Sequence, residues 1–174
     1  MHETEEDLAR LQRLLDESYA AAGGHLLSIH TPDRRMTAGQ LSETLTGVRV
    51  LSLATVTASG EPLVGPVDGL FYRGRFWFGS AQESVRFRHI RARPAVSASH
   101  TVGEELAVVV HGNAREIDVD AAEQDGFRAY LREVYGPQWE RWWPGRKPPY
   151  AMIEPRRMFT FHMDARRPPQ PDPG

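Results

Sequence analysis

The sequence predicts an antiparallel β-barrel or sandwich with flanking helices. Six short segments are rich in β-branched and aromatic residues, and few long helices are predicted between them. Turn sequences at Ser59-Gly60 and Arg73-Gly74 connect the first three segments as a meander. A doubly wound α/β fold would need helical crossovers at both places, so these turns disfavour it.

Residues 1–47 are expected to form a helical extension ahead of the barrel. A helix is predicted over 3–22, because four leucines recur at helical spacing and acidic residues fill the first turn. The segment 25–36 has no clear period and contains loop-forming residues. A capping-box pattern predicts a second, short helix over 38–46.

Residues 48–164 are expected to form the barrel itself. The expected strands are 48–57, 61–72, 75–80, 95–101, 105–117 and 157–163. Pro62 and Pro66 interrupt the second strand and indicate an edge, a bulge or a strand start, because proline has no N–H to donate. Helices are predicted over 84–93 and 121–135.

Two stretches near the C-terminus have unusual composition. The loop before the last strand is dense in aromatic residues: Trp139, Trp142, Trp143 and Tyr150. Such a cluster indicates either an interface with a partner or substrate, or packing over the barrel end. Residues 165–174 are too rich in proline to pack, so we expect a disordered or extended tail.

Composition and charge exclude several function classes. The 174 residues include 21 basic and 23 acidic ones, a formal net charge of −2, which disfavours general binding to nucleic acid or a membrane surface. Without cysteine the chain has no disulfide framework, thiolate metal site or cysteine nucleophile. The acidic start and the lack of an apolar run of about 18 residues predict a cytoplasmic protein without a membrane span.

The most informative stretch for function is residues 80–94, which follow a predicted strand and open a predicted helix. The free N–H groups of a helix start, together with the Ser84 hydroxyl, would form an anion pocket. Arg86 and Arg88 lie in the first helical turn, where each guanidinium could fork onto a phosphate. A solvated arginine-rich helix face is the alternative. Four arginines within eight residues of an acidic chain favour the anion site.

Other residues that could support chemistry have ordinary alternatives. The seven histidines show no paired metal spacing, so no metal ligand is assigned. His100 and His111 lie on neighbouring predicted strands, where they could meet in a haem or metal site or simply be hydrogen-bonded or solvent-facing. The sequence has no glycine-rich phosphate loop, no GxSxG motif and no evident carboxylate pair, which disfavours a hydrolase.

The order of these motifs resembles that of the pyridoxamine 5′-phosphate oxidase-like family of split β-barrel flavoproteins and its deazaflavin (coenzyme F420)-binding relatives. The matching stretches are LATVTASGEPLVGPV (53–67), FWFGS (76–80), SVRFRHIRARPAVSAS (84–99), VVVHGNAREI (108–117) and EPRRMFTF (154–161). The resemblance implies an antiparallel split β-barrel that forms a homodimer, binds FMN at the subunit interface and acts on a small molecule.

The resemblance also implies which residues bind the cofactor. Arg86 matches the basic phosphate ligand of the family, Ser84 its small hydroxyl ligand, and Ser80 a residue that reaches the phosphate or the ring edge. The segment 66–68 matches the strand that lines the isoalloxazine ring. The expected cofactor-binding residues are Pro66, Val67, Asp68, Ser80, Ser84, Arg86, Arg88 and Arg91. No catalytic residue is assigned.

Departures from the family pattern bear on the substrate. Where the oxidase has an arginine for the phosphate in the second strand, this chain has Gly65, and where it has a glutamine toward the ring, this chain has Ala107. The C-terminal segment that binds the pyridoxal substrate has no match. These differences disfavour oxidation of vitamin B6 and favour a general flavin or deazaflavin reductase, or a flavin carrier. The first hypothesis is an FMN-dependent oxidoreductase of unknown substrate.

Two alternatives remain open from the sequence. The same scaffold could hold F420, whose longer acidic tail would use Arg91, Arg93 or the pair Arg146 and Lys147. It could also be a non-catalytic carrier or sensor of flavin or haem.

Overall fold

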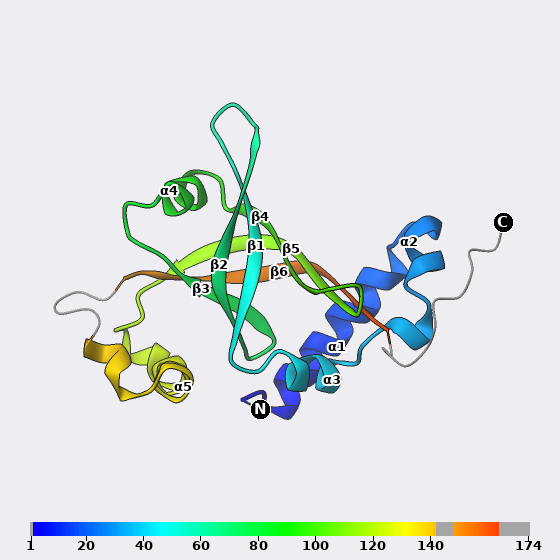
Figure 1. The fold of residues 1–174 in the computed structure, drawn as a ribbon, viewed down its shortest axis with the longest axis horizontal. Coiled ribbons are helices and arrows are strands. Elements are labelled where there is room, and N and C mark those ends of the chain that lie inside the picture. Colours follow the sequence, from blue (N-terminus) through cyan, green and yellow to red (C-terminus); the bar gives the residue numbers. More distant parts are fainter. Residues whose placement is uncertain (1, 142–147, 164–174) are drawn as a thin grey trace.

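A computed structural model describes residues 2–141 and 148–163 (Figure 1). Six antiparallel strands close into a barrel in the order β1-β2-β3-β6-β5-β4, which confirms the predicted fold class. The strands are β1 Val48–Val56, β2 Pro62–Tyr72, β3 Arg75–Gly79, β4 Ala95–Val102, β5 Leu106–Ile117 and β6 Tyr150–His162. The predicted tail, together with Trp142, Trp143, Arg146 and Lys147, lies outside the described residues.

Tight turns connect the first three strands as predicted. Arg73 and Gly74 have φ values of 51° and 73°, a left-handed pair that suits a two-residue hairpin between β2 and β3. Gly60 supplies the positive φ at the tip of the β1–β2 hairpin, which projects beyond the barrel beside α4 in Figure 1. The meander therefore follows from local turn chemistry.

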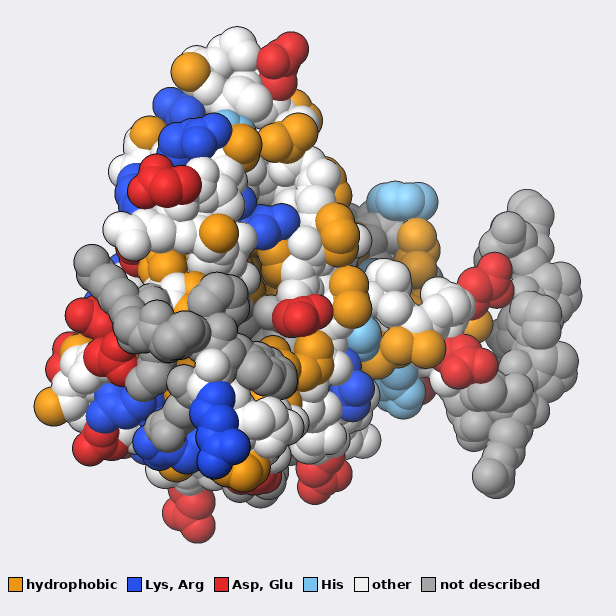
Figure 2. Space-filling model, turned by 60° about the vertical axis from the view of Figure 1, so that its left-hand side comes forward, with side chains coloured by type: hydrophobic (Ala, Val, Ile, Leu, Met, Phe, Trp, Pro, Cys, Tyr) orange, Lys and Arg blue, Asp and Glu red, His pale blue; other side chains and the backbone are white. Residues whose placement is uncertain are grey.

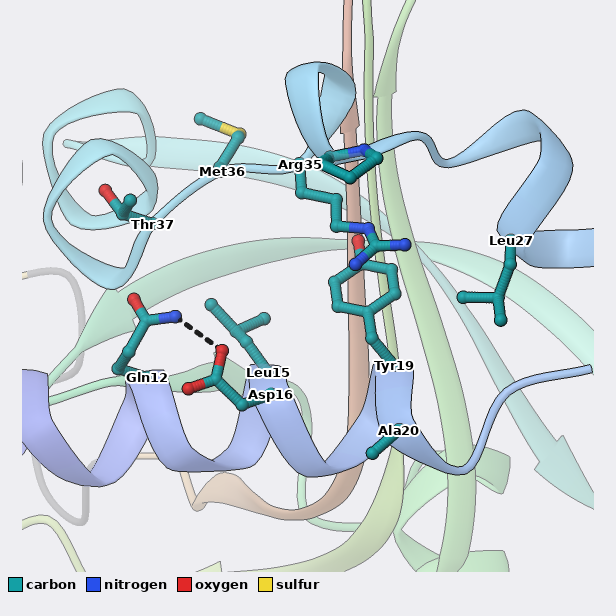
Figure 3. A pocket seen from close by; sticks show the side chains of 10 residues that line it. Gln12, Leu15, Asp16, Tyr19, Ala20, Leu27, Arg35, Met36 and Thr37 are labelled. Carbon is teal, nitrogen blue, oxygen red and sulfur yellow. Dashed lines mark hydrogen bonds between the residues drawn. The ribbon is translucent and has the colours of Figure 1, made fainter.

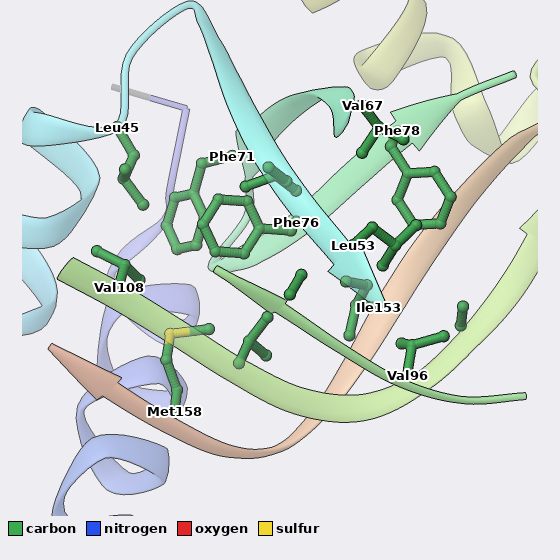
Figure 4. Close-up of a cluster of buried hydrophobic side chains, with 14 of the residues drawn as sticks. Leu45, Leu53, Val67, Phe71, Phe76, Phe78, Val96, Val108, Ile153 and Met158 are labelled. Carbon is green, nitrogen blue, oxygen red and sulfur yellow. The ribbon is translucent and has the colours of Figure 1, made fainter. Parts of the chain in front are cut away.

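Alternating side chains fill the barrel. In β1 the apolar Leu51 and Leu53 are buried and Ser52 between them is exposed, which is the pattern of a strand with one face toward a core. Figure 4 shows the resulting cluster, in which aromatic side chains of β2 and β3 meet aliphatic ones of β4, β5 and β6. Phe71 and Phe76 pack edge-to-face across β2 and β3, with ring centroids 5.0 Å apart.

Helices cover the barrel at three places. The α-helices are α1 Glu5–Ala20, α2 Gly24–Ile29, α3 Ala38–Thr44, α4 Val85–Ala92 and α5 Asp125–Tyr135, and the 3-10 helices are η1 Pro32–Arg34, η2 Ala122–Gln124 and η3 Pro137–Arg141. Helices α1 and α4 contribute Leu11, Leu15, Phe87 and Ile90 to the same core as the barrel. Helix α5 packs on a second apolar cluster over the outer face of β2, β3 and β6. No helix among the described residues is long and apolar enough to cross a membrane.

Two elements differ from the sequence prediction. Strand β6 begins at Tyr150 rather than near residue 157, and it pairs with β5 through a register shift between His111 and Gly112. Polar residues around Pro155 interrupt the apolar pattern of β6 at that bulge. The first half of the strand therefore could not be recognised from the sequence pattern. The segment 25–36, predicted without regular structure, contains α2 and η1, both too short to show a period.

The aromatic loop packs over the barrel where the structure describes it. Trp139 and Tyr150 are buried in the second cluster, and the Trp139 Nε1–H donates to the Tyr150 hydroxyl at 3.3 Å. For these two residues, packing over the barrel end is therefore the correct alternative.

Candidate functional site

The start of α4 is fixed by one serine and two buried apolar residues. The Ser84 Oγ accepts a hydrogen bond from the Phe87 N–H at 3.3 Å, so Ser84 is the predicted N-cap. Phe87 and Ile90 are buried in the barrel core and hold the helix against the barrel. The N–H groups of Val85 and Arg86 have no acceptor among the described residues. The first turn of α4 therefore keeps donors available for an anion.

A small cavity lies between this helix start and the β1–β2 hairpin. Its volume is about 160 Å³. It is lined by Thr55, Leu63, Val64, Gly65, Ser84, Val85 and Arg86. One wall is thus polar and comes from α4, and the other is mostly apolar and comes from β2.

Arg86 is the centre of the polar wall. Its Nη1 donates to the Ser80 Oγ and its Nη2 to the Pro66 carbonyl oxygen, both at 3.1 Å. Burial lowers the pKa of Arg86, although an arginine remains charged at any physiological pH. No carboxylate among the described residues pairs with it. Arg86 therefore brings Ser80 and Pro66 together around a half-buried positive charge that has no counter-ion within residues 2–141 and 148–163.

Gly65 provides the space that this guanidinium occupies. A Cβ atom at position 65 would lie 3.3 Å from the Arg86 Nη2, which is tighter than ordinary van der Waals contact. The strand position where the family pattern has an arginine is thus filled by a guanidinium from the neighbouring helix.

The other candidate arginines lie away from the cavity. Arg88 is exposed, and its Nη1 donates to the Glu83 carbonyl oxygen at 2.9 Å. Arg91 forms a two-pronged ion pair with Glu116, with N–O distances of 2.7 and 3.1 Å. Hydrogen bonding to Glu116 raises the pKa of Arg91. A carboxylate therefore already balances the Arg91 charge.

The candidate residues of β2 alternate in orientation. Val67 is buried among the barrel residues, whereas Pro66 and Asp68 are exposed on the outer face. Asp68 lies close enough to Tyr150 for its charge to add to the effect of burial, which raises the pKa of that tyrosine. Of the three residues, Pro66 touches Arg86 directly through its carbonyl group.

Sequence reasoning missed part of the site. Thr55 lines the cavity, and its Oγ1 is hydrogen-bonded to the Nδ1 of His89 at 2.9 Å. The predicted β1–β2 hairpin could have indicated Thr55, because it pairs Thr55 with Leu63, another residue that lines the cavity. Glu116 was missed because it lies 25 residues from Arg91 in the sequence, on β5, and only the packing of α4 against β5 brings the two together.

The histidines on β4 and β5 are engaged separately. The Nδ1 of His100 is 3.0 Å from the Val50 carbonyl oxygen, and the Nδ1 of His111 is 2.8 Å from the Ser97 Oγ. Within residues 2–141 and 148–163, no three His, Asp or Glu side chains are grouped to hold a metal ion.

Several solved structures share this fold at low sequence identity. A conserved hypothetical protein from Mycobacterium tuberculosis is 19% identical with a TM-score of 0.62, and the match covers 75% of this chain and 88% of that one. An FAD-binding protein from Mesorhizobium loti is 21% identical with a TM-score of 0.56, with 73% and 93% covered. The heme storage protein HutZ from Vibrio cholerae is 15% identical with a TM-score of 0.58, with 71% and 91% covered.

Sequence comparison identifies the family. No curated protein matches the chain. The family described as pyridoxamine 5′-phosphate oxidase matches residues 37–167, which include the whole barrel and α4. The chain therefore belongs to the pyridoxamine 5′-phosphate oxidase family.

Proposed function

We propose that this protein is a flavin-dependent oxidoreductase that binds FMN, with the FMN phosphate on Arg86 and the first turn of α4. The observation that supports this most is the half-buried Arg86 guanidinium without a carboxylate partner. A buried charge is costly unless it is paired, and a phosphate would supply both the opposite charge and several acceptor oxygens.

The residues around the cavity fit a phosphate. Arg86, the Ser84 hydroxyl and the unpaired N–H groups of Val85 and Arg86 are all donors at one helix start. FMN would supply the redox chemistry when bound, and this chain would bind and orient it. We place the flavin ring along residues 66–68 of β2, beside the exposed Pro66 and Asp68.

The cavity of one subunit is too small for a whole flavin mononucleotide. Its volume of about 160 Å³ is below the roughly 300–1,000 Å³ of typical ligand pockets. Val50, Val64 and Val85 on β1, β2 and the start of α4 remain 57%, 63% and 43% exposed. Figure 2 shows hydrophobic side chains running down the middle of one face, below the hairpin tip, with basic side chains beside them. These observations support a homodimer in which the partner subunit completes the site.

The ion pair of Arg91 with Glu116 favours FMN over F420. The acidic tail of F420 would need free positive charge beyond the phosphate site. At Arg91 it would meet a carboxylate as well as a guanidinium.

Titration of the cofactor-free protein tests the proposal. Fluorescence quenching should report tighter binding of FMN than of F420. Arg86→Ala should weaken FMN binding by about 1.5–3 kcal/mol, the usual loss for a charged hydrogen bond. Arg88→Ala is the matched control, because Arg88 is an exposed arginine on the same helix, and it should retain wild-type affinity within about threefold.

Three outcomes would contradict parts of the proposal. Equal effects of Arg86→Ala and Arg88→Ala would remove Arg86 from the phosphate site. Tighter binding of F420 would replace FMN by F420 as the proposed cofactor. Tight FMN binding without reduction of the flavin by NADH or NADPH would indicate a carrier or sensor.

A further inference from the structure

A second cavity lies outside the barrel, between α1 and the segment that leads into α3 (Figure 3). Its volume is about 440 Å³, within the range of small-molecule sites. Apart from Thr37, its lining residues precede the part of the chain that matches the family, which begins at residue 37. The cavity is therefore a feature of the N-terminal extension and separate from the proposed flavin site.

Both walls of this cavity are tied to one buried residue of β6. From α1, the Tyr19 hydroxyl donates to the Thr160 carbonyl oxygen at 2.6 Å. From the opposite wall, the Met36 N–H donates to the Thr160 Oγ1 at 2.9 Å. Because Thr160 is fully buried in the barrel strand, the walls are held at a fixed separation. The cavity is preformed.

Arg35 presents a positioned guanidinium to the cavity. Its Nε donates to the His30 carbonyl oxygen at 2.8 Å, and its Cζ lies 4.2 Å from the centroid of the Tyr19 ring. In Figure 3 the guanidinium extends from the upper wall toward that ring. Its two terminal nitrogens have no acceptor among the described residues. The fork is thus stacked and oriented, with donors left for a carboxylate.

Asp16 presents an exposed carboxylate from the other wall, and one hydrogen bond from Gln12 orients it. The Gln12 Oε1 accepts the Ala38 N–H, and the Gln12 Nε2 donates to the Asp16 Oδ1, both at 2.9 Å. Asp16 and Arg35 line the same cavity, yet no ion pair joins them. A half-buried cation and an exposed anion therefore line one cavity, whose lining also includes the apolar side chains of Leu15, Leu27 and Met36.

We propose that this cavity binds a free amino acid with a large apolar side chain. The ligand carboxylate would pair with Arg35, its ammonium group with Asp16, and its side chain would pack against the apolar part of the lining, which includes Leu15, Leu27 and Met36. A ligand with only a negative charge would be repelled by Asp16, and one with only a positive charge by Arg35. A zwitterion satisfies both charges at once.

Calorimetric titration of the full chain with three related probes tests this inference. L-Phenylalanine has both charges, 3-phenylpropanoate lacks the ammonium group, and 2-phenylethylamine lacks the carboxylate. We expect L-phenylalanine to bind and each of the other two to bind at least about tenfold more weakly, the loss expected for one charged hydrogen bond. This comparison uses the wild-type protein and does not depend on the folding of any variant.

Two substitutions and a matched control locate the site. Arg35→Gln and Asp16→Asn should each weaken L-phenylalanine binding by at least about tenfold. Arg34→Gln is the control, because the Arg34 guanidinium lies over Phe161, 5.6 Å from its ring centroid, outside the cavity lining. It should bind L-phenylalanine as wild type does. All three variants should bind FMN unchanged, so this proposal can fail without the flavin proposal failing.

The inference is overturned if calorimetry detects no binding of L-phenylalanine at a concentration of about 10 mM. A dissociation constant weaker than that is too weak for a preformed site. It is also overturned if the two single-charge probes bind as well as the amino acid. Equal affinities of Arg34→Gln and Arg35→Gln would place the bound molecule elsewhere.

Discussion

Arg86 shows how one residue can take the place of another that the family pattern expects. Gly65 leaves an open volume on β2, and the Arg86 guanidinium enters it from α4 to reach the Pro66 carbonyl. The advantage of glycine here is space rather than backbone conformation, since its φ is not in the left-handed region and a Cβ would crowd only the Arg86 Nη2. Two hydrogen bonds thereby position the guanidinium before any ligand binds. The Arg86 side chain therefore loses less conformational entropy when it binds a ligand.

Glu116 pairs with Arg91 in the last turn of α4 and balances its positive charge. We predict that Glu116→Gln strengthens F420 binding by about three- to tenfold, because it frees Arg91 for an acidic tail. FMN affinity should change by less than about twofold, because FMN has no such tail. Glu154→Gln is the matched control, since Glu154 of β6 forms an exposed ion pair with Arg115, the neighbour of Glu116 on β5. An equal gain for both ligands, measured by fluorescence titration, would contradict a tail-specific role.

At the scale of elements, α4 joins stability to ligand binding through its N-cap. We predict that Ser84→Ala lowers the free energy of unfolding by about 0.5–2 kcal/mol, because the cap to the Phe87 N–H is lost. Ser84→Asp should keep the cap and therefore the stability, yet weaken FMN binding by at least about tenfold through repulsion of the phosphate. Urea unfolding and FMN titration measure the two effects separately. Loss of both properties in Ser84→Asp would mean that the cap geometry alone governs binding.

The packing of α5 and η3 on the barrel includes two buried, un-ionised tyrosines, Tyr130 and Tyr150. Burial raises the pKa of Tyr150 and of Tyr130 above the ordinary value of 10.0. A raised pKa means that ionisation favours the unfolded chain, so this stability is complete below pH 10 and is lost as pH rises above it.

The measurement is urea unfolding at about pH 8 and about pH 11. Wild type should lose stability between the two. Tyr150→Phe should lose less, although it begins about 1 kcal/mol lower because the hydrogen bond from Trp139 is absent. An identical decrease in both proteins would show that Tyr150 does not contribute to alkaline unfolding.

At the scale of the whole molecule, the parts of the fold that could be predicted are those with local causes. The β1–β3 meander follows from two turns and clear alternation, and helices α1, α3 and α4 follow from their N-caps. The first half of β6 could not be predicted, because its pairing depends on a bulge opposite Gly112, where a Cβ would lie 2.2 Å from the Glu154 carbonyl oxygen. The position of Arg86 in the first turn of a helix was predicted from the sequence, whereas its contact with the Pro66 carbonyl oxygen and the Arg91–Glu116 pair depend on tertiary packing that no motif encodes.

The arrangement of exposed apolar residues predicts the oligomeric state. Val64 is 63% exposed on β2 beside the proposed flavin site, and a dimer that covers this face would bury it. We expect light scattering to give a dimer. Val64→Asp should raise its dissociation constant by at least about tenfold, because a carboxylate would be placed in an apolar contact. FMN affinity should fall with it, since the partner subunit would complete the site.

The matched control for that variant is Val102→Asp, the same change at another exposed valine at the end of β4, which is 48% exposed. It should leave both the dimer and FMN binding unchanged. If Val64→Asp remained dimeric and bound FMN normally, the partner subunit would have to approach through a different face. A wild-type protein that stays monomeric with FMN bound would mean that one barrel holds the flavin alone, in a site much larger than the cavity at Arg86.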